Sequence, residues 1–294
     1  MWQYLRYRVL ALLVGILPES AAVHAGYSIG YLLSFVAREK FHIAKQRMQE
    51  VLGRDVPQKQ VRKATRRMLG FWGRYWAEIF WIRSQRLEKM LARIQVEGIE
   101  NLLSAQNTKK GIIVISAHIG NVEVAGAWYA ARYGKKLLVV TENLENPRIL
   151  KWSTKRRRAM NIEVLVAGTQ NTPRQIREHL RKEGVVVLLN DRIFPSIKGI
   201  STSFFGQEIE MPRGPATLAL TSNAPLLPVA VYFEKNGHRI VISPPLSIPQ
   251  APTREERITE GAQQVASALE KMIRRVPEQW LIAPTTVPFS NLRR

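Results

Sequence analysis

A histidine and a carboxylate lie where an apolar run gives way to a helical pattern. His118 follows the β-branched run 111–115, and Glu123 comes five residues later. In α/β folds, ligands collect at the carboxyl ends of strands, so chemistry is expected at this turn. An imidazole there can act as a general base near neutral pH, with Glu123 holding the ring in one tautomer. Asn121 can cap this helix, whose first turn carries Glu123. The alternative is a structural histidine that lies near a capping glutamate.

A second group of candidate residues follows a later apolar run. Asp191 and Arg192 come directly after residues 185–190, and Arg192 can bind a phosphate or a developing oxyanion through two parallel hydrogen bonds. Arg213 stands at a proline-initiated helix start, where backbone amides favour an anion. Arg158 ends a basic run that could contact phosphates. Each has an alternative. Asp191 and Arg192 could form an ion pair that closes the strand end, Arg213 could be an exposed cation at a helix end, and Arg158 could lie on a solvated helix face.

These motifs resemble those of a known family. His118-Ile119-Gly120-Asn121 followed by Glu123 resembles the His-x-x-x-x-Asp/Glu signature of the glycerolipid acyltransferase superfamily. Within it, the sequence looks like the bacterial lipid A late-acyltransferase branch, which includes the phosphatidylinositol mannoside acyltransferases. The resemblance covers roughly residues 1–285. The later motifs that carry it, in order, are Asn190-Asp191-Arg192, Phe204-Phe205-Gly206, 211–216 (Met-Pro-Arg-Gly-Pro-Ala) and 226–229 (Leu-Leu-Pro-Val).

The resemblance implies an O-acyltransferase of EC 2.3.1 type. Such an enzyme moves a fatty acyl group from acyl coenzyme A or acyl carrier protein to a hydroxyl of a glycolipid. We expect His118 as general base with Glu123 as its partner, and no bound cofactor or metal. The residues expected to bind substrate are Asn121, Arg158, Asp191, Arg192 and Arg213.

The expected acceptor is an anionic glycolipid. The run Asp191-Arg192-Ile193 stands where lipid A members commonly show Asp-x-Asp, and together with residues 211–216 it favours a phosphatidylinositol mannoside-like acceptor over a lipid A precursor. A neutral acceptor would not call for so many cations near one face. Those cations are Arg156, Arg157, Arg158, Arg192 and Arg213.

Composition leaves two classes of partner open. The 294 residues are 46% hydrophobic, enough to bury a sizeable core, and the absence of cysteine excludes disulfides and a cysteine nucleophile. The formal charge of +21 attracts an anionic membrane surface or a nucleic acid. The competing hypothesis is therefore a basic α/β nucleic-acid-binding protein without acyltransferase activity. It predicts aromatics interleaved with cations, whereas many aromatics here cluster towards the amino terminus.

The amino-terminal part is expected to associate with a membrane. The runs 9–17 and 21–37 do not match the roughly 20 apolar residues of a spanning helix. We expect interfacial or shallowly inserted helices on the cytoplasmic face of the inner membrane, and the family-like sequence that follows argues against a cleavable signal peptide. Five aromatics suit the headgroup boundary or else pack between helices: Trp2, Tyr4, Tyr7, Tyr27 and Tyr31.

The predicted fold class is α/β, with a central, largely parallel sheet flanked by helices. Residues 1–95 form a helical, membrane-associating segment, and residues 96–294 form the acyltransferase domain. The aromatic stripe between Phe71 and Trp81 predicts core packing, part of which could line an acyl-chain groove. Strands are expected at 112–116, 137–141, 162–166, 185–189, 226–233 and 239–243. Helices are expected at 120–132, 147–160, 173–182, 212–222 and 254–275.

Overall fold

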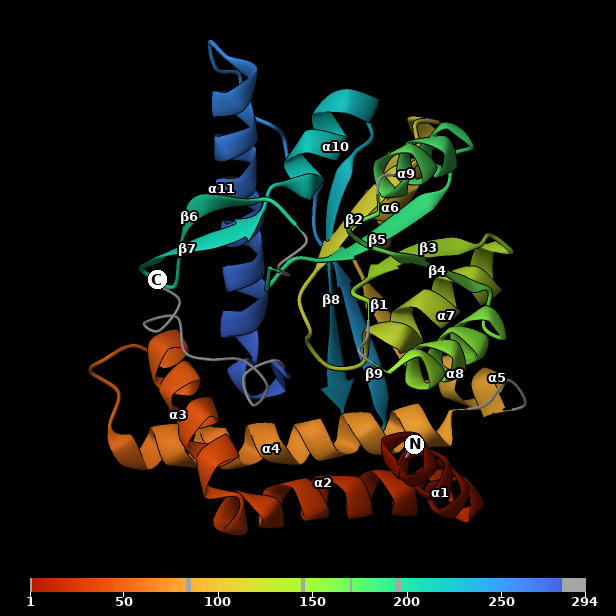
Figure 1. The fold of residues 1–294 in the computed structure, drawn as a ribbon, viewed down its shortest axis with the longest axis vertical. Helices are drawn as coiled ribbons and strands as arrows, with labels where there is room; N and C mark the ends of the chain where they lie inside the picture. The colour runs from red at the N-terminus through yellow and green to blue at the C-terminus, as the bar shows by residue number, and fades with distance from the viewer. Residues whose placement is uncertain (1, 83–85, 144–145, 170, 194–196, 282–294) are drawn as a thin grey trace.

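The computed structural model describes residues 2–82, 86–143, 146–169, 171–193 and 197–281. It has a seven-stranded sheet with helices on both faces and a layer of amino-terminal helices across one end (Figure 1). The strand order is β1-β9-β8-β2-β5-β3-β4, and only β8 and β9 pair antiparallel within it. The strands are β1 (Ile94–Glu97), β2 (Ile112–Ser116), β3 (Leu137–Thr141), β4 (Ile162–Val166), β5 (Val185–Leu189), β8 (Leu226–Glu234) and β9 (Gly237–Ile242).

The expected α/β class with a mostly parallel sheet is confirmed. Four expected strands have the bounds that the sequence predicts, and β8 and β9 differ by one or two residues. The central strand β8 is buried along nearly its whole length, as its continuous apolar run predicts for a strand covered on both faces. Strand β1 and the separate antiparallel hairpin of β6 (Gly199–Phe204) and β7 (Gln207–Pro212) lie outside the predicted set.

Helices cover the two faces of the sheet with separate apolar cores. One core joins the sheet to α6 (Ile99–Asn107) and α7 (Val122–Tyr133), and the other joins it to α9 (Thr172–Arg181), α10 (Gly214–Ser222) and α11 (Arg254–Arg275). Helix α8 (Pro147–Arg158) precedes β4 at the edge of the sheet.

The amino-terminal layer is built on one close helix–helix contact. The layer comprises α1 (Trp2–Ile16), α2 (Glu19–Val36), α3 (Arg38–Leu52) and α4 (Gln58–Trp81), followed by the short α5 (Leu87–Leu91). A Cβ built on Gly30 of α2 would lie 2.1 Å from the Leu69 carbonyl oxygen of α4. Glycine is therefore needed for the two backbones to approach. The guanidinium of Arg74 ties α4 to the sheet by donating to the carbonyls of Glu234 (2.9 Å) and Gly237 (3.2 Å).

Large apolar side chains are exposed mainly on α1 and α2. Within the described ranges, no helix is long and apolar enough to cross a membrane. Of the aromatics predicted either to lie at the headgroup boundary or to pack between helices, Tyr7 packs edge-on against Trp76 and Phe80 of α4. Trp2, in contrast, is exposed. The exposed apolar residues of these helices are Trp2, Leu5, Val9, Leu10, Leu12, Leu13, Ile16, Ile29, Leu32, Leu33, Phe35 and Val36.

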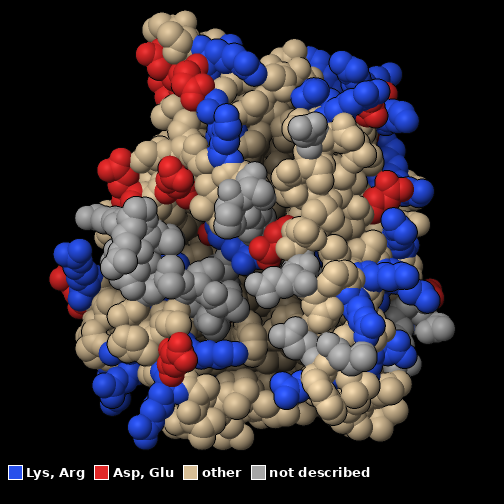
Figure 2. All heavy atoms as spheres, viewed as in Figure 1, with Lys and Arg blue, Asp and Glu red and all other residues tan. Residues whose placement is uncertain are grey.

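Charged side chains are intermixed on the face that Figure 2 shows. Lys and Arg are spread over that face, and Asp and Glu lie among them. The excess positive charge is therefore not collected there into a single stripe of the kind that follows a nucleic-acid backbone.

Candidate active site

The residue that holds the candidate base is Asp191. His118 follows β2 and Asp191 follows β5, and these strands are parallel neighbours, so their carboxyl ends meet. The His118 ring Nδ1 lies 2.7 Å from Asp191 Oδ1, and the His118 backbone N–H donates to Oδ2 at 2.8 Å. The carboxylate therefore fixes both the ring and its backbone, with Nδ1 as donor. Nε2 is the nitrogen left to meet a substrate.

The carboxyl-terminal segment completes this arrangement. The indole N–H of Trp280 donates to Asp191 Oδ2 at 2.7 Å, and the Leu281 backbone N–H donates to the His118 carbonyl at 2.8 Å. Burial alone raises the pKa of Asp191, but the His118 charge and the hydrogen bonds from His118 and Trp280 outweigh it and hold that pKa below its ordinary value. Asp191 is thus ionised at neutral pH. Its side chain is 0% exposed, so the expected substrate contact is wrong, and Asp191 instead positions the ring of the candidate base.

The expectation that Glu123 holds the His118 ring is also wrong. Glu123 lies in the first turn of α7, and its carboxylate accepts hydrogen bonds from Arg157 Nε at 2.9 and 3.0 Å. Arg157 also pairs with it through Nη2. Asp191 is 73 residues from His118 in the chain, so only the order of the strands brings them together.

Asn121 points into the protein. It occupies the N-cap position of α7 but makes no side-chain capping bond, and it is 0% exposed. Its Nδ2 donates to Glu78 Oε2 at 2.8 Å. The expected cap and substrate contact are therefore both wrong, because the amide belongs to a buried network with α4.

That network centres on the carboxylate of Glu78. It also meets His238 Nε2 at 2.9 Å and accepts from Arg74 Nε at 2.9 Å. Burial raises the pKa of Glu78, but His238, Arg74 and the hydrogen bond from Asn121 together lower it to about 2. The network thus fixes the amino-terminal layer to the turn that carries His118.

A cleft of about 620 Å³ opens beside His118, between the sheet and the amino-terminal layer. Glu123, Arg157 and Arg192 line it from the sheet side. Part of the aromatic stripe of α4 lines it too, as expected, while Phe80 and Trp81 are buried. The aromatic side chains lining the cleft are Tyr7, Trp72, Tyr75, Trp76 and Trp152.

An apolar cavity of about 90 Å³ lies between the sheet and α6 and α7. This cavity and the cleft share Val122, Glu123 and Arg157 as lining residues, so the two hollows are neighbours. Apart from Ser116, Glu123 and Arg157, nearly all its lining side chains are apolar or aromatic. Such a cavity suits an alkyl chain.

The five expected cations divide between separate sites. Arg156 and Arg157 line the cleft with Arg192, whose Nη2 pairs with Glu142. Arg156 also donates to the carbonyls of Ile79 and Ile82 at the end of α4.

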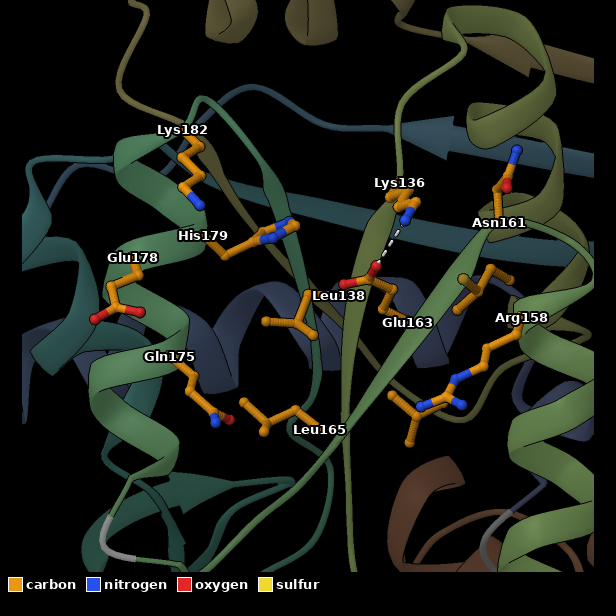
Figure 3. A pocket seen from close by; sticks show the side chains of 12 residues that line it. Lys136, Leu138, Arg158, Asn161, Glu163, Leu165, Gln175, Glu178, His179 and Lys182 are labelled. Atoms are coloured by element: carbon orange, nitrogen blue, oxygen red, sulfur yellow. Dashed lines mark hydrogen bonds and ion pairs between the residues drawn. The ribbon is translucent and has the colours of Figure 1, made fainter.

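The other two cations do not line this cleft, and their expected contact with substrate stays a prediction. Arg158 lines a pocket over β3 and β4, where Figure 3 shows the Glu163 carboxylate turned towards Lys136 and His179 on the side of the pocket opposite Arg158. Arg213 pairs with Glu255 at 2.8 Å and lines a further cavity. Consecutive helical residues diverge by about 100°, so Arg157 and Arg158 face different sides.

Comparison with known proteins shows similarity along almost the whole chain. The family model described as bacterial lipid A biosynthesis acyltransferase matches residues 1–283. A phosphatidylinositol mannoside acyltransferase of Mycolicibacterium smegmatis is 28% identical over 228 residues, 77% of this chain and 71% of that protein. One of Mycobacterium tuberculosis (strain H37Rv) is 32% identical over 180 residues, 60% of this chain and 56% of that protein. A lipid A biosynthesis palmitoleoyltransferase of Escherichia coli is 26% identical over 189 residues, 63% of this chain and 58% of that protein.

Proposed function

Because the chain belongs to the bacterial lipid A biosynthesis acyltransferase family, we propose that it transfers a fatty acyl group from a thioester to a hydroxyl of an anionic glycolipid. Membership confirms the expected family and the acyltransferase class. It gives no support to the alternative of a nucleic-acid-binding protein. The observation that carries the mechanism is the His118–Asp191 pair at the wall of the cleft.

In this mechanism His118 is the general base. Its Nε2 takes the proton from the acceptor hydroxyl as the hydroxyl oxygen attacks the thioester carbonyl carbon. Asp191 keeps Nδ1 protonated and stabilises the imidazolium. Collapse of the tetrahedral intermediate breaks the carbon–sulfur bond, and the departing thiolate takes the proton from His118, which leaves an ester and a thiol. Arg192 is the cation that we assign to the developing oxyanion.

The donor is an acyl thioester whose chain enters the apolar cavity. The support is that this cavity shares lining residues with the cleft and offers an apolar wall to an alkyl chain. Each methylene moved out of water contributes about 0.8 kcal/mol. Acyl coenzyme A and acyl carrier protein both present the required thioester.

The acceptor is an anionic glycolipid of the phosphatidylinositol mannoside type. The names of the two mycobacterial relatives support this choice over a lipid A precursor. The cations that line the cleft supply the complementary charge, although Arg157 and Arg192 are partly neutralised by Glu123 and Glu142.

The enzyme acts at a membrane surface. The family comprises bacterial lipid A biosynthesis acyltransferases, and the exposed apolar faces of α1 and α2 belong to the layer that also lines the cleft. We place the protein peripherally or shallowly inserted at the cytoplasmic face of the inner membrane. There an acceptor headgroup can reach His118 while its acyl chains stay in the bilayer.

The test is acyl transfer by purified protein from labelled palmitoyl coenzyme A or palmitoyl acyl carrier protein. The acceptors are phosphatidylinositol mannosides, lipid A precursors and uncharged lipids. His118→Ala should lower the rate by roughly 10²–10⁴-fold, the usual contribution of a general base. His42→Ala is the matched control, since that side chain is exposed on α3. Near-normal single-turnover transfer by folded His118→Ala protein would refute the mechanism, and transfer to uncharged lipids alone would refute the acceptor.

A further inference from the structure

A cavity of about 530 Å³ opens at the carboxyl ends of β3 and β5, across the sheet from the apolar cavity. Its floor is apolar and includes Val140, Ile176 and Leu188. Arg192 lines both this cavity and the cleft beside His118, so the two hollows are neighbours. Nothing in the acyl-transfer step proposed above uses this space.

Cations from several elements surround the cavity. None of the described residues that line it is an Asp or a Glu. The pocket in Figure 3 differs, because there Glu163 lies 3.1 Å from Lys136 and offsets its charge. The lining cations are Arg177 of α9, Arg192 after β5, Lys198 before β6, Arg213 before α10 and Arg254 at the start of α11.

Three of these cations are not neutralised within the described part of the chain. Arg192 and Arg213 pair with Glu142 and Glu255. Arg177, Lys198 and Arg254 form no ion pair with any described residue. Like charges held around one hollow repel each other, so an anion bound there would lower that energy.

A buried amide oxygen gives an independent indication of a ligand. Asn190 lines the cavity and is 3% exposed, yet its Oδ1 has no hydrogen-bond partner among the described residues. A buried acceptor left unpaired costs about 1–3 kcal/mol. A ligand that carries a hydroxyl or amide N–H would satisfy it.

We propose that this cavity binds a phosphate ester carried by one of the two substrates. The proposal rests on the proposed function and adds a subsite to it. The chemistry is a phosphate ester beside hydroxyl or amide groups, and both a phosphopantetheine-type donor and a phosphoinositol-type headgroup offer it. The cations bind the phosphate, the amino terminus of α10 adds backbone N–H groups, and Asn190 accepts a hydrogen bond.

Direct binding tests the site without any acyl transfer. Titration calorimetry measures the Kd of coenzyme A and of myo-inositol 1-phosphate for the full chain. Lys198→Gln with Arg254→Gln should weaken one of these about tenfold. Lys110→Gln with Lys235→Gln removes the same charge from exposed positions outside the cavity and should leave both Kd values unchanged. If the Lys198/Arg254 variant binds only coenzyme A more weakly, the cavity binds the phosphate of the donor. If it binds only the inositol phosphate more weakly, the cavity binds the phosphate of the acceptor.

Kinetics provide the second readout. The Lys198/Arg254 variant should show about a tenfold higher KM for the substrate so identified, with kcat kept. If that substrate is the donor, the KM for the phosphate-free thioester S-palmitoyl-N-acetylcysteamine should not change. No binding of either probe, or equal weakening in both double variants, would overturn the site. Probe binding that depends on Lys198 and Arg254 in a protein that transfers no acyl group would overturn the proposed function alone.

Discussion

The carboxylate of Asp191 meets three N–H groups, two from His118 and one from Trp280. A buried anion requires such donors, because each lone pair left without one costs free energy. Since one oxygen holds the ring and the other holds the backbone of the same residue, the ring orientation depends on the Asp191 charge and position together. Glu123 has its own cation and lies outside this arrangement.

The two carboxylates should therefore differ in mutational effect. We expect Asp191→Asn to lower kcat by about 10²–10⁴-fold, because the imidazolium loses its counter-charge and the ring loses its fixed tautomer. Glu123→Gln should lower kcat by less than about tenfold and act mainly through the position of Arg157. Single-turnover rates together with thermal unfolding of both variants check this. A larger rate loss for Glu123→Gln in a stably folded protein would contradict the assignment of Asp191.

At this scale the sequence predicted correctly that His118 follows a strand, but it named the wrong carboxylate as the contact of its ring. The catalytic role of His118 stays a prediction. The turn after an apolar run is a local feature, so it placed His118 at a strand end. The pairing with Asp191 depends on β5 inserting between β2 and β3, and nothing in the chain order indicates that insertion. The sequence does mark Asp191 as the charged residue at the end of another buried strand. Its contact with His118, however, follows only from the strand order.

At the scale of elements, the ionised carboxylate of Glu78 fixes α4 to the turn that carries His118. Glu78 bonds Asn121 of the turn, His238 of β9 and Arg74 of its own helix. Removing its charge leaves the Arg74 guanidinium buried without its counter-ion. The position of the turn therefore depends on the ionisation of a residue 40 positions before His118 in the chain.

The pH dependence of the free energy of unfolding should reveal the contribution of the ionised Glu78 carboxylate. The folded-state pKa of Glu78 is lowered to about 2 from an ordinary value of 4.5. Its contribution is therefore present above about pH 4.5 and is lost as the pH falls towards 2. That contribution is of order 3 kcal/mol, at about 1.4 kcal/mol per pKa unit. Glu78→Gln should be less stable at pH 7 and lose less stability on acidification, as measured by urea unfolding at a series of pH values. An unchanged acid slope in this variant would contradict the prediction.

The contact between α2 and α4 should tolerate no added side chain. Gly30→Val places a Cβ against the Leu69 carbonyl, so the helices must separate, at a cost of about 1–3 kcal/mol typical of overpacking. Ala25→Val adds a β-branched side chain at an exposed position of the same helix and serves as the control. Thermal unfolding should show a lower Tm for Gly30→Val than for Ala25→Val. Equal Tm values would mean that this contact does not hold the layer together.

The strands that the sequence predicts correctly are those with a continuous run of apolar residues. Runs such as Val185–Leu189 are apolar throughout, which is typical of buried parallel strands. Strand β1 has only four residues, β6 contains the polar run Ser201-Thr202-Ser203, and β7 alternates Glu with Ile and Met over only a few residues. None of these strands therefore stands out from a loop. The 1–95 and 96–294 division stays an interpretation.

For the whole molecule, the exposed apolar surface of α1 and α2 belongs to the layer of helices that lines one side of the cleft beside His118. An exposed apolar surface of this extent on one layer marks a contact with a membrane or another protein. The net charge of +21 adds attraction to anionic headgroups.

Vesicle binding should depend on the exposed face of α2. Leu32→Asn removes an apolar side chain that is 63% exposed, and we expect about tenfold weaker partitioning into anionic vesicles, because insertion loses part of the 1.5–3 kcal/mol that burial of such a side chain contributes. The matched control is Leu103→Asn, the same change at an exposed helical leucine outside the amino-terminal layer. Sedimentation with vesicles of phosphatidylglycerol and phosphatidylcholine measures both. Two results would contradict this prediction: no binding of the unaltered protein to these vesicles, or equal weakening by Leu103→Asn. In either case α2 is not the membrane-facing surface, and its exposed leucines would be a contact surface for another protein.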